Sequence, residues 1–222
     1  RAAHHGLLDA DSDLEVAGKP EHLLEHPEVM VDFTHLEAAR HNLAWCAERG
    51  VHAVVGTTGF TDEDLERFRA TFTRSNCLIA PNFAIGAILM MRFAELAAPW
   101  FDTAEVIELH HDAKVDSPSG TAMRTVERMA AASSDWSDDP TTTHTVAGAR
   151  GGVGPGGIHI HAVRMRGMVA HQEVLLGATG QTLSIRHDSY DRSSFMPGVV
   201  LAAKRIGELP GVTVGLDVLL DL

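Results

Sequence analysis

Short, almost entirely apolar runs alternate with longer segments of helical periodicity through the first half of the chain. The apolar runs predict strands over residues 29–34, 51–55 and 77–80. The periodic segments predict helices over residues 35–49, from Thr61 onward and over 85–98, with Gly50 and Thr61 as caps. Strands that are apolar on both faces are typical of a parallel sheet that helices cover on both sides. This half is therefore predicted to be an α/β layer structure.

Each predicted strand ends in small or polar residues. The three ends are Asp32-Phe33-Thr34, Gly56-Thr57-Thr58-Gly59 and Ala80-Pro81-Asn82-Phe83. Open parallel sheets bind their ligands beyond the carboxyl ends of the strands, where small residues allow close backbone approach. A flat, polar ligand such as a dinucleotide fits this edge, which would make the sheet Rossmann-like. Ordinary strand-to-helix turns would give the same residue types, so the pattern alone leaves both readings open.

The glycine-rich phosphate turn of a dinucleotide fold, G-x-G-x-x-G, does not occur before Val29. The glycine-rich run at 148–157 follows no strand and leads into one, which predicts a loop. We expect either that the first strand–helix unit lies upstream of Arg1 or that the fold is of another type. Residues 7–10 are typical of a second strand's end, and Asp9 stands where such folds bind the adenosine ribose.

The spacing of apolar residues changes in the second half of the chain. A strand over 104–111 and a helix over 119–132 precede a polar loop, and three alternating strands and a closing helix follow, over 158–166, 170–179, 181–190 and 193–208. Alternation predicts a sheet with two unlike faces. We therefore expect a nucleotide lobe over 1–103, an α+β lobe with a mixed sheet for substrate binding and oligomerisation over 104–195, and a tail over 196–222 that returns to the nucleotide lobe.

The composition narrows the possible partners. A formal net charge of −12 argues against nucleic acid or an anionic membrane as the main partner, although it does not exclude a small anionic ligand. No apolar run reaches the roughly 18 residues of a membrane span. The two cysteines, Cys46 and Cys77, have no metal-type spacing and predict buried, reduced thiols of a cytosolic protein.

The segment from His110 to Ala122 contains the densest set of reactive side chains. His110, His111 and Lys114 lie within five positions, and Ser119-Gly120-Thr121 opens a helix whose N–H groups can hold a carboxylate or phosphate. A histidine there can supply a proton near neutral pH. A lone strand-end histidine or loop lysine is usually a solvated surface residue, but the combination favours a site for an anionic substrate.

This segment, His110-His111-x-x-Lys114-x-Asp116-x-Pro118-Ser119-Gly120-Thr121-Ala122, resembles the active-site motif of the dihydrodipicolinate reductases. The preceding Glu108-Leu109 resembles the family too. So do the three strand ends above and the segments 148–151, 161–164, 167–174 and 186–189, in the family's order over nearly the whole chain. The resemblance is closest to the actinobacterial branch.

The resemblance implies an NADH- or NADPH-dependent reductase of 4-hydroxy-tetrahydrodipicolinate in diaminopimelate and lysine biosynthesis, cytoplasmic and assembled as a homotetramer through the second-lobe sheets. It implies that His110 is the general acid/base and Lys114 a second proton donor. The residues that it implies for the dicarboxylate substrate are His111, Gly120 and Thr121. Those that it implies for the cofactor are Gly56, Thr57 and Thr58 at the nicotinamide, Ala80, Pro81, Asn82 and Phe83 on its other side, and Asp9 at the ribose.

Two alternatives remain from the residues. A metal-dependent hydrolase is suggested by 14 histidines, although the His159-x-His161 pair lies on a predicted strand rather than in a ligand loop. We therefore expect no metal site. A ligand-binding or regulatory homologue that kept the substrate lobe and lost its cofactor is suggested by the missing glycine turn.

Overall fold

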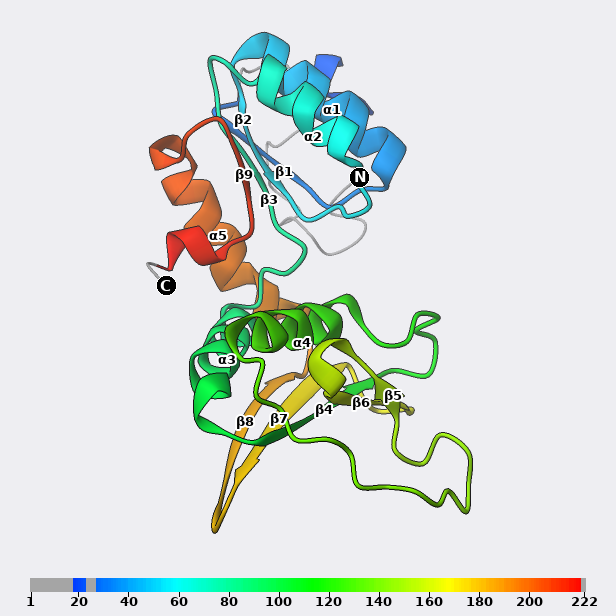
Figure 1. The fold of residues 1–222 in the computed structure, drawn as a ribbon. Coiled ribbons are helices and arrows are strands. Elements are labelled where there is room, and N and C mark those ends of the chain that lie inside the picture. The colour runs from blue at the N-terminus through cyan, green and yellow to red at the C-terminus, as the bar shows by residue number, and fades with distance from the viewer. Residues whose placement is uncertain (1–17, 23–26, 221–222) are drawn as a thin grey trace. The chain divides into compact units, whose positions relative to one another are not determined.

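The computed structural model describes residues 18–22 and 27–220, which form two compact units (Figure 1). Unit 1 runs to Pro81 and includes Ala202–Val214, whereas unit 2 comprises Asn82–Leu201 and the segment from Gly215 onward. Asp9 lies outside the described residues. Among the residues described, no helix is long and apolar enough to cross a membrane.

Unit 1 is built on a parallel sheet of four strands in the order β1-β2-β3-β9 (Figure 1). The strands are β1 (Val29–Asp32), β2 (His52–Val55), β3 (Cys77–Ile79) and β9 (Val212–Val214). Helices α1 (Leu36–Arg49) and α2 (Asp62–Thr71) pack beside each other on it, and a short 3-10 turn spans Pro20–His22. The parallel sheet is confirmed. Strand β9 was not predicted, because a three-residue strand has almost no period and its partner β3 is remote in sequence.

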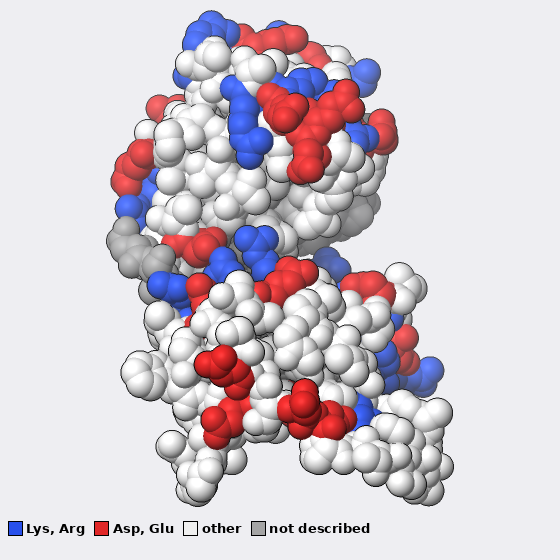
Figure 2. Space-filling view, viewed as in Figure 1, with Lys and Arg blue, Asp and Glu red and all other residues white. Residues whose placement is uncertain are grey.

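The ends of α1 and α2 follow from their sequences. Gly50 ends α1 in the left-handed conformation, at φ 71°, which a residue without Cβ adopts at little cost. Thr61 and Asp64 form a reciprocal capping box at the start of α2. Hydrogen bonds from Arg40, the largest influence, lower the pKa of Asp64 to about 2. Both predicted caps are confirmed, and basic and acidic side chains intermingle over these helices (Figure 2).

The core of unit 1 lies between the sheet and these helices. Its largest members are Leu43, Trp45, Phe68, Phe72 and Ile79. Cys46 and Cys77 are free and buried in this core, as predicted. Burial, with a smaller contribution from Asp32, raises the pKa of the Cys46 thiol to about 12, so it remains protonated and unreactive at neutral pH.

Unit 2 contains a mixed sheet of five strands in the order β5-β6-β4-β7-β8. These are β4 (Thr103–His110), β5 (Gly152–Val153), β6 (His159–Arg164), β7 (Ala170–Ala178) and β8 (Gln181–Ser189). Only β4 and β6 pair in parallel. Helices α3 (Ile85–Ala97) and α4 (Gly120–Ala132) cover one face around Val106, Met129 and Val174. The mixed sheet is confirmed, and α5 (Met196–Arg205) follows β8.

Five 3-10 turns complete the described part of the chain after β3. They span Ala98–Trp100, Pro155–Gly157, Arg192–Phe195, Ile206–Glu208 and Asp217–Leu219. The turn at Arg192–Phe195 explains why α5 begins at Met196 rather than at the predicted Ser193. Pro197 stands at the second position of α5, where its missing N–H leaves no helical hydrogen bond unmade.

The division between the units differs from the expected boundary after residue 103. Helix α3 packs against α4 and β8, so contacts assign it to unit 2 and place the division at Pro81. Of the tail expected to return to the nucleotide lobe, only Ala202–Val214 clusters with unit 1, because β9 pairs with β3 there. The sequence pattern located most of the elements, but it missed β9, predicted a loop where β5 lies and did not show which elements pack together.

We predict that Gly198→Ala destabilises the protein, although alanine is the better helix former. A Cβ at Gly198, inside α5, would lie 2.0 Å from the carbonyl oxygen of Phe83. Overpacking should lower the free energy of unfolding by about 1–3 kcal/mol, against a gain of about 0.5–1 kcal/mol from helix propensity. Urea unfolding measures the difference. Gly207→Ala is the control, since a Cβ there meets no atom within 4 Å; equal stability of the two variants would contradict the prediction.

Candidate active site

The reactive segment connects the end of β4 to the start of α4. His110 is the last residue of β4, and Gly120 is the first of α4. Ser119 caps the helix, because its side chain accepts a hydrogen bond from the Ala122 N–H. The Ser119 N–H in turn donates to the Glu108 carboxylate at 3.1 Å. A side chain of β4 therefore holds the beginning of α4 beside the strand that carries His110.

Glu108 is the fully buried carboxylate at the centre of this site, with none of its surface exposed. Arg164 of β6 donates to both of its oxygens, at 2.9 and 2.8 Å. His110 Nδ1 lies 2.5 Å from Glu108 Oε2. Burial by itself would raise the pKa of Glu108, but the hydrogen bonds from Arg164 and His110 outweigh it and keep the pKa below its ordinary value. Glu108 is therefore anionic at neutral pH.

His110 is held by this carboxylate and is only 16% exposed in its side chain. Burial lowers the pKa of His110, and the opposing influence of Glu108 does not fully offset it. The ring is therefore mostly neutral at neutral pH. With Nδ1 engaged by Glu108, Nε2 is the ring nitrogen left to exchange a proton with a ligand.

Lys114 lies in the loop between β4 and α4. Its Nζ donates to both carboxylate oxygens of Asp116, at 2.7 and 2.9 Å, and its side chain is 21% exposed. The hydrogen bond from Lys114 lowers the pKa of Asp116. The main-chain oxygen of Asp116 accepts a hydrogen bond from Arg164 Nη2 at 2.7 Å. Arg164 thus contacts both Glu108 and the loop that carries the ammonium group.

The residues expected at the substrate share this strand–helix junction. His111 is exposed, and its carbonyl oxygen accepts the Lys114 N–H in a turn. Gly120 is open, since a Cβ there would meet no atom within 4 Å. The Thr121 hydroxyl accepts from Asn82 Nδ2 at 3.3 Å. The start of α4 therefore combines free space at Gly120 with helix N–H groups, which suits a carboxylate.

A second set of polar residues lies at the strand ends of unit 1. Buried Asp32, the last residue of β1, accepts hydrogen bonds from the Thr34 N–H and from Asn42 Nδ2. The Thr57 hydroxyl lies 3.0 Å from Asp32 Oδ1, and the Gly56 N–H donates to the Asp32 main-chain oxygen. The structure therefore ties two of the expected cofactor residues, Gly56 and Thr57, to the neighbouring strand. Thr58 follows them and is exposed.

The remaining residues expected at the cofactor follow β3. The Ala80 N–H donates to the Val55 carbonyl oxygen, which continues the sheet by one residue. Pro81 is the last residue of the first part of unit 1, and Asn82 begins unit 2. Asn82 Oδ1 accepts the Ala84 N–H ahead of α3, and Phe83 is buried.

Glu108 and Arg164 were given no role from the sequence, and Asp32 was expected only as part of the strand ends that bind a ligand. Glu108 had a detectable signal, because a residue two positions before His110 shares its face of the strand. Arg164 had none, because its approach to Glu108 depends on the parallel register that pairs it with His110. Asp32 stood at a strand end with the other polar residues, and nothing distinguished it before its hydrogen bonds were known.

Over residues 18–22 and 27–220, no group of three or more His, Cys, Asp or Glu side chains is placed to hold a metal ion. His159 is bonded to the Arg150 carbonyl oxygen and to Asp139, and His161 to Glu105. His159 and His161 of the metal-hydrolase alternative thus have separate partners.

Comparison with known proteins agrees with this arrangement. The family model "Dihydrodipicolinate reductase, N-terminus" matches residues 4–83, and "Dihydrodipicolinate reductase, C-terminus" matches residues 86–220. The chain is 52% identical over 198 residues to 4-hydroxy-tetrahydrodipicolinate reductase of Mycolicibacterium vanbaalenii, covering 88% of this chain and 81% of the relative. It is 53% identical over 199 residues to the Mycobacterium marinum enzyme of the same name, with the same coverage.

A solved structure shows the same fold. Dipicolinate-bound dihydrodipicolinate reductase from Paenisporosarcina sp. TG-14 superposes with a TM-score of 0.78 at 43% identity, over 86% of this chain and 73% of that one. The parallel sheet of unit 1, the mixed sheet of unit 2 and these likenesses define a pyridine-nucleotide-dependent oxidoreductase. The chain belongs to the dihydrodipicolinate reductase family, which serves diaminopimelate and lysine biosynthesis.

We predict that the cost of Asp32→Asn depends on pH. Burial alone would raise the pKa of Asp32, but hydrogen bonds from Asn42, Thr34 and Thr57 lower it overall. A depressed folded-state pKa stabilises the protein above the unfolded value, near 4, and this stabilisation is lost as the pH falls through the folded value.

Asp32→Asn should therefore lower the unfolding free energy by about 1–3 kcal/mol at neutral pH, and this deficit should shrink below about pH 4. Urea unfolding at several pH values measures it. Glu66→Gln, at an exposed position of α2, is the control. A deficit that is the same at neutral and acid pH would contradict the prediction.

Proposed function

We propose that this chain reduces 4-hydroxy-tetrahydrodipicolinate with NADH or NADPH, with His110 as the general acid/base and Lys114 as a second proton donor. The observation that supports it most directly is the bond between His110 Nδ1 and buried Glu108, which leaves Nε2 for proton exchange beside the start of α4. The relatives' name supplies the substrate, and the dipicolinate of the Paenisporosarcina structure is a planar dicarboxylate of the same class.

The candidate substrate residues would bind the carboxylates of the substrate or transfer a proton to it. A dicarboxylate needs cationic or N–H partners, and Lys114, Gly120 and Thr121 offer an ammonium group and a helix start. His111 lies exposed beside them. The 4-hydroxyl of the substrate leaves as water to give a conjugated imine. As hydride arrives there, negative charge develops on the ring, and a proton quenches it, either from Lys114 Nζ or from Nε2 of His110 in its imidazolium form. Lys114 must exchange its bond to Asp116 for one to substrate.

The strand ends of unit 1 are the proposed cofactor site. A nicotinamide nucleotide bound there supplies the hydride. The proposed partners of a nicotinamide carboxamide are main-chain groups of Gly56, Thr57 and Thr58 other than the Gly56 N–H, which is bonded to Asp32 and fixes the turn. Ala80, Pro81, Asn82 and Phe83 are proposed on the other side of the ring, and Asp9 at the ribose.

We predict that His110→Gln lowers kcat by about a hundredfold or more while KM changes little, because a proton-transfer group is lost and the binding groups remain. Lys114→Ala should lower kcat and raise KM, because it removes a proton donor and a carboxylate partner together. Steady-state kinetics with enzymatically generated substrate, run with NADH and with NADPH, measures both and gives the cofactor preference. Near-normal turnover of His110→Gln would remove His110 from the mechanism.

The cofactor-deficient alternative is tested on the same protein. Titration of NADH and NADPH, followed by fluorescence or calorimetry, should show saturable binding by the full-length gene product. No binding of either nucleotide would favour a ligand-binding or regulatory role. Cytoplasmic localisation is part of the proposal and follows from a biosynthetic role.

The face of the unit 2 sheet opposite α3 and α4 is the proposed surface for a homotetramer. Residues that pair across the strands share this face, among them Ile107 and Leu109 of β4, Val163 of β6 and Leu175 of β7. They are half-buried and surrounded by ion pairs such as Arg186–Glu173. An apolar centre with a charged rim is the composition of an interface between subunits.

We predict that Ile107→Asp breaks this assembly, because a carboxylate would be desolvated at the centre of the sheet face beside Glu173, its partner across β7. Light scattering should give a tetramer for the parent protein and a smaller species for Ile107→Asp. Leu96→Asp, at an exposed position of α3, is the control and should keep the parent mass. A tetramer in Ile107→Asp would place the interface elsewhere.

A further inference from the structure

Glu108 is surrounded by donors from three parts of unit 2. Its Oε1 accepts from Arg164 Nη2 at 2.8 Å and from the Ser119 N–H at 3.1 Å. Its Oε2 accepts from Arg164 Nη1 at 2.9 Å and faces His110 Nδ1 at 2.5 Å. Strand β4, strand β6 and the start of α4 therefore meet at one carboxylate.

A buried ion pair of this kind is a poor source of stability. Removing a carboxylate and a guanidinium from water costs several kcal/mol for each ion, and well-packed apolar residues often serve stability equally well. Stability alone therefore does not explain why Glu108 and Arg164 form a buried ion pair here. Glu108 contacts the side chain of His110, and Arg164 contacts the main chain of Asp116, whose carboxylate holds Lys114; His110 and Lys114 are the two proposed proton donors.

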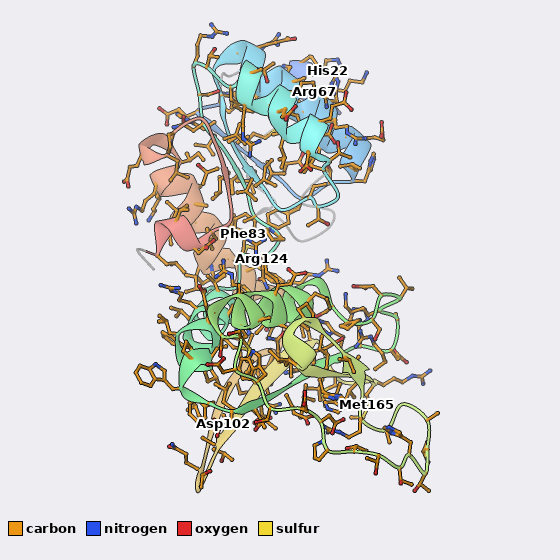
Figure 3. The ribbon with its side chains drawn as sticks, in the orientation of Figure 1. His22, Arg67, Phe83, Asp102, Arg124 and Met165 are labelled. Atoms are coloured by element: carbon orange, nitrogen blue, oxygen red, sulfur yellow. The ribbon has the colours of Figure 1, made fainter. Side chains whose placement is uncertain are left out.

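Arg164 connects the two proposed proton donors. Its guanidinium binds the carboxylate that holds His110, and the same Nη2 donates to the main-chain oxygen of Asp116, whose side chain holds Lys114. The parallel register places Arg164 directly opposite His110. The next residue, Met165, labelled in Figure 3, donates its N–H to the His110 carbonyl oxygen at 3.0 Å. The backbone and the side chain of one strand end thus secure both groups.

We propose that Glu108 and Arg164 are positioning residues of the reaction: Glu108 accepts the Nδ1 proton of His110, so that Nε2 is the atom that transfers a proton to substrate, and Arg164 fixes Glu108 and the Lys114 loop together. This inference rests on the proposed role of His110. A hydrogen-bonded carboxylate that selects the tautomer and stabilises the imidazolium has the same physical role in other His-dependent enzymes.

The charges around His110 set the direction of the expected pH effect. The Glu108 carboxylate favours the imidazolium, whereas Lys114 and Arg164 oppose it, and Asp116 lies beyond Lys114 as its partner. Replacing Glu108 by glutamine leaves the two cations uncompensated. Protonated His110 then persists only to a lower pH, so the basic limb of the kcat–pH profile should move to lower pH.

Strand β4 offers a matched control three residues earlier. Glu105 also bonds to a histidine and an arginine, His161 and Arg150, but three positions along a strand place it on the opposite face, which is the face proposed for subunit contact. The kcat of Glu105→Gln is therefore compared with that of the parent at the parent's oligomeric mass. Glu105→Gln therefore removes the same kind of carboxylate from the same kind of partners, away from His110. Light scattering of both variants separates any effect on assembly from an effect on chemistry.

The experiment compares Glu108→Gln, Arg164→Lys and Glu105→Gln. Glu108→Gln should lower kcat by about tenfold to a hundredfold with KM within about threefold, and should move the basic limb to lower pH. Arg164→Lys should lower kcat less and raise KM more, because one ammonium cannot reach Glu108 and Asp116 together. Glu105→Gln should stay within about twofold of the parent in kcat. Parent-like kcat and pH profile in Glu108→Gln would overturn the proposal.

A spectroscopic measurement keeps the proposal testable if a variant folds poorly. In 15N-histidine-labelled parent protein, the His110 signals, assigned by their loss in His110→Gln, should show a neutral ring protonated on Nδ1. A ring protonated on Nε2 would overturn the proposal without any variant of Glu108. Nucleotide titration and thermal melting of each variant report whether the fold is intact. The single variant Glu108→Gln leaves the charge of Arg164 buried and unpaired, whereas the double variant Glu108→Gln/Arg164→Met removes both buried charges.

The same series separates this proposal from the proposed role of His110. If His110→Gln is inactive and Glu108→Gln behaves like the parent, His110 acts without its buried partner, and only the positioning proposal fails. If His110→Gln keeps its turnover, the assignment of His110 as acid/base fails first.

Discussion

The arrangement of unit 2 depends on one carboxylate in a place without water. Glu108 can be charged there only because Arg164, the Ser119 N–H and His110 surround it with donors. Those donors belong to β6, to the start of α4 and to β4 itself. The requirement to satisfy a single buried charge therefore sets the position of a helix N-terminus, a strand end and a histidine ring relative to one another.

Unit 1 uses the same physical device at its strand ends. Buried Asp32 gathers Thr34, Asn42 and Thr57, so the turn after β2 is tied to the end of β1. In both units a buried carboxylate near the carboxyl end of a strand holds polar groups of the proposed ligand sites. Gly120 adds open space at the start of α4, because a Cβ there would meet no atom within 4 Å.

Several strands, helix caps and reactive residues of this protein could be predicted from the sequence alone. Apolar runs located β1, β2 and β3, and residue chemistry located the caps at Gly50 and Thr61, because these features depend on neighbours within a few positions. The motif around His110 and Lys114 pointed to the family that the comparisons then showed. The sequence did not predict strand β9, the packing of α3 within unit 2 or the contacts of Arg164.

The sequence by itself determined which residues carry reactive groups and where most of the strands and helices lie, since periodicity and side-chain chemistry are local properties. Only the tertiary structure decided their partners. Arg164 is 56 positions from Glu108, and Thr57 is 25 from Asp32. Such pairs form when the register of a sheet brings them within hydrogen-bond distance, and register depends on the packing of the whole unit rather than on any one segment.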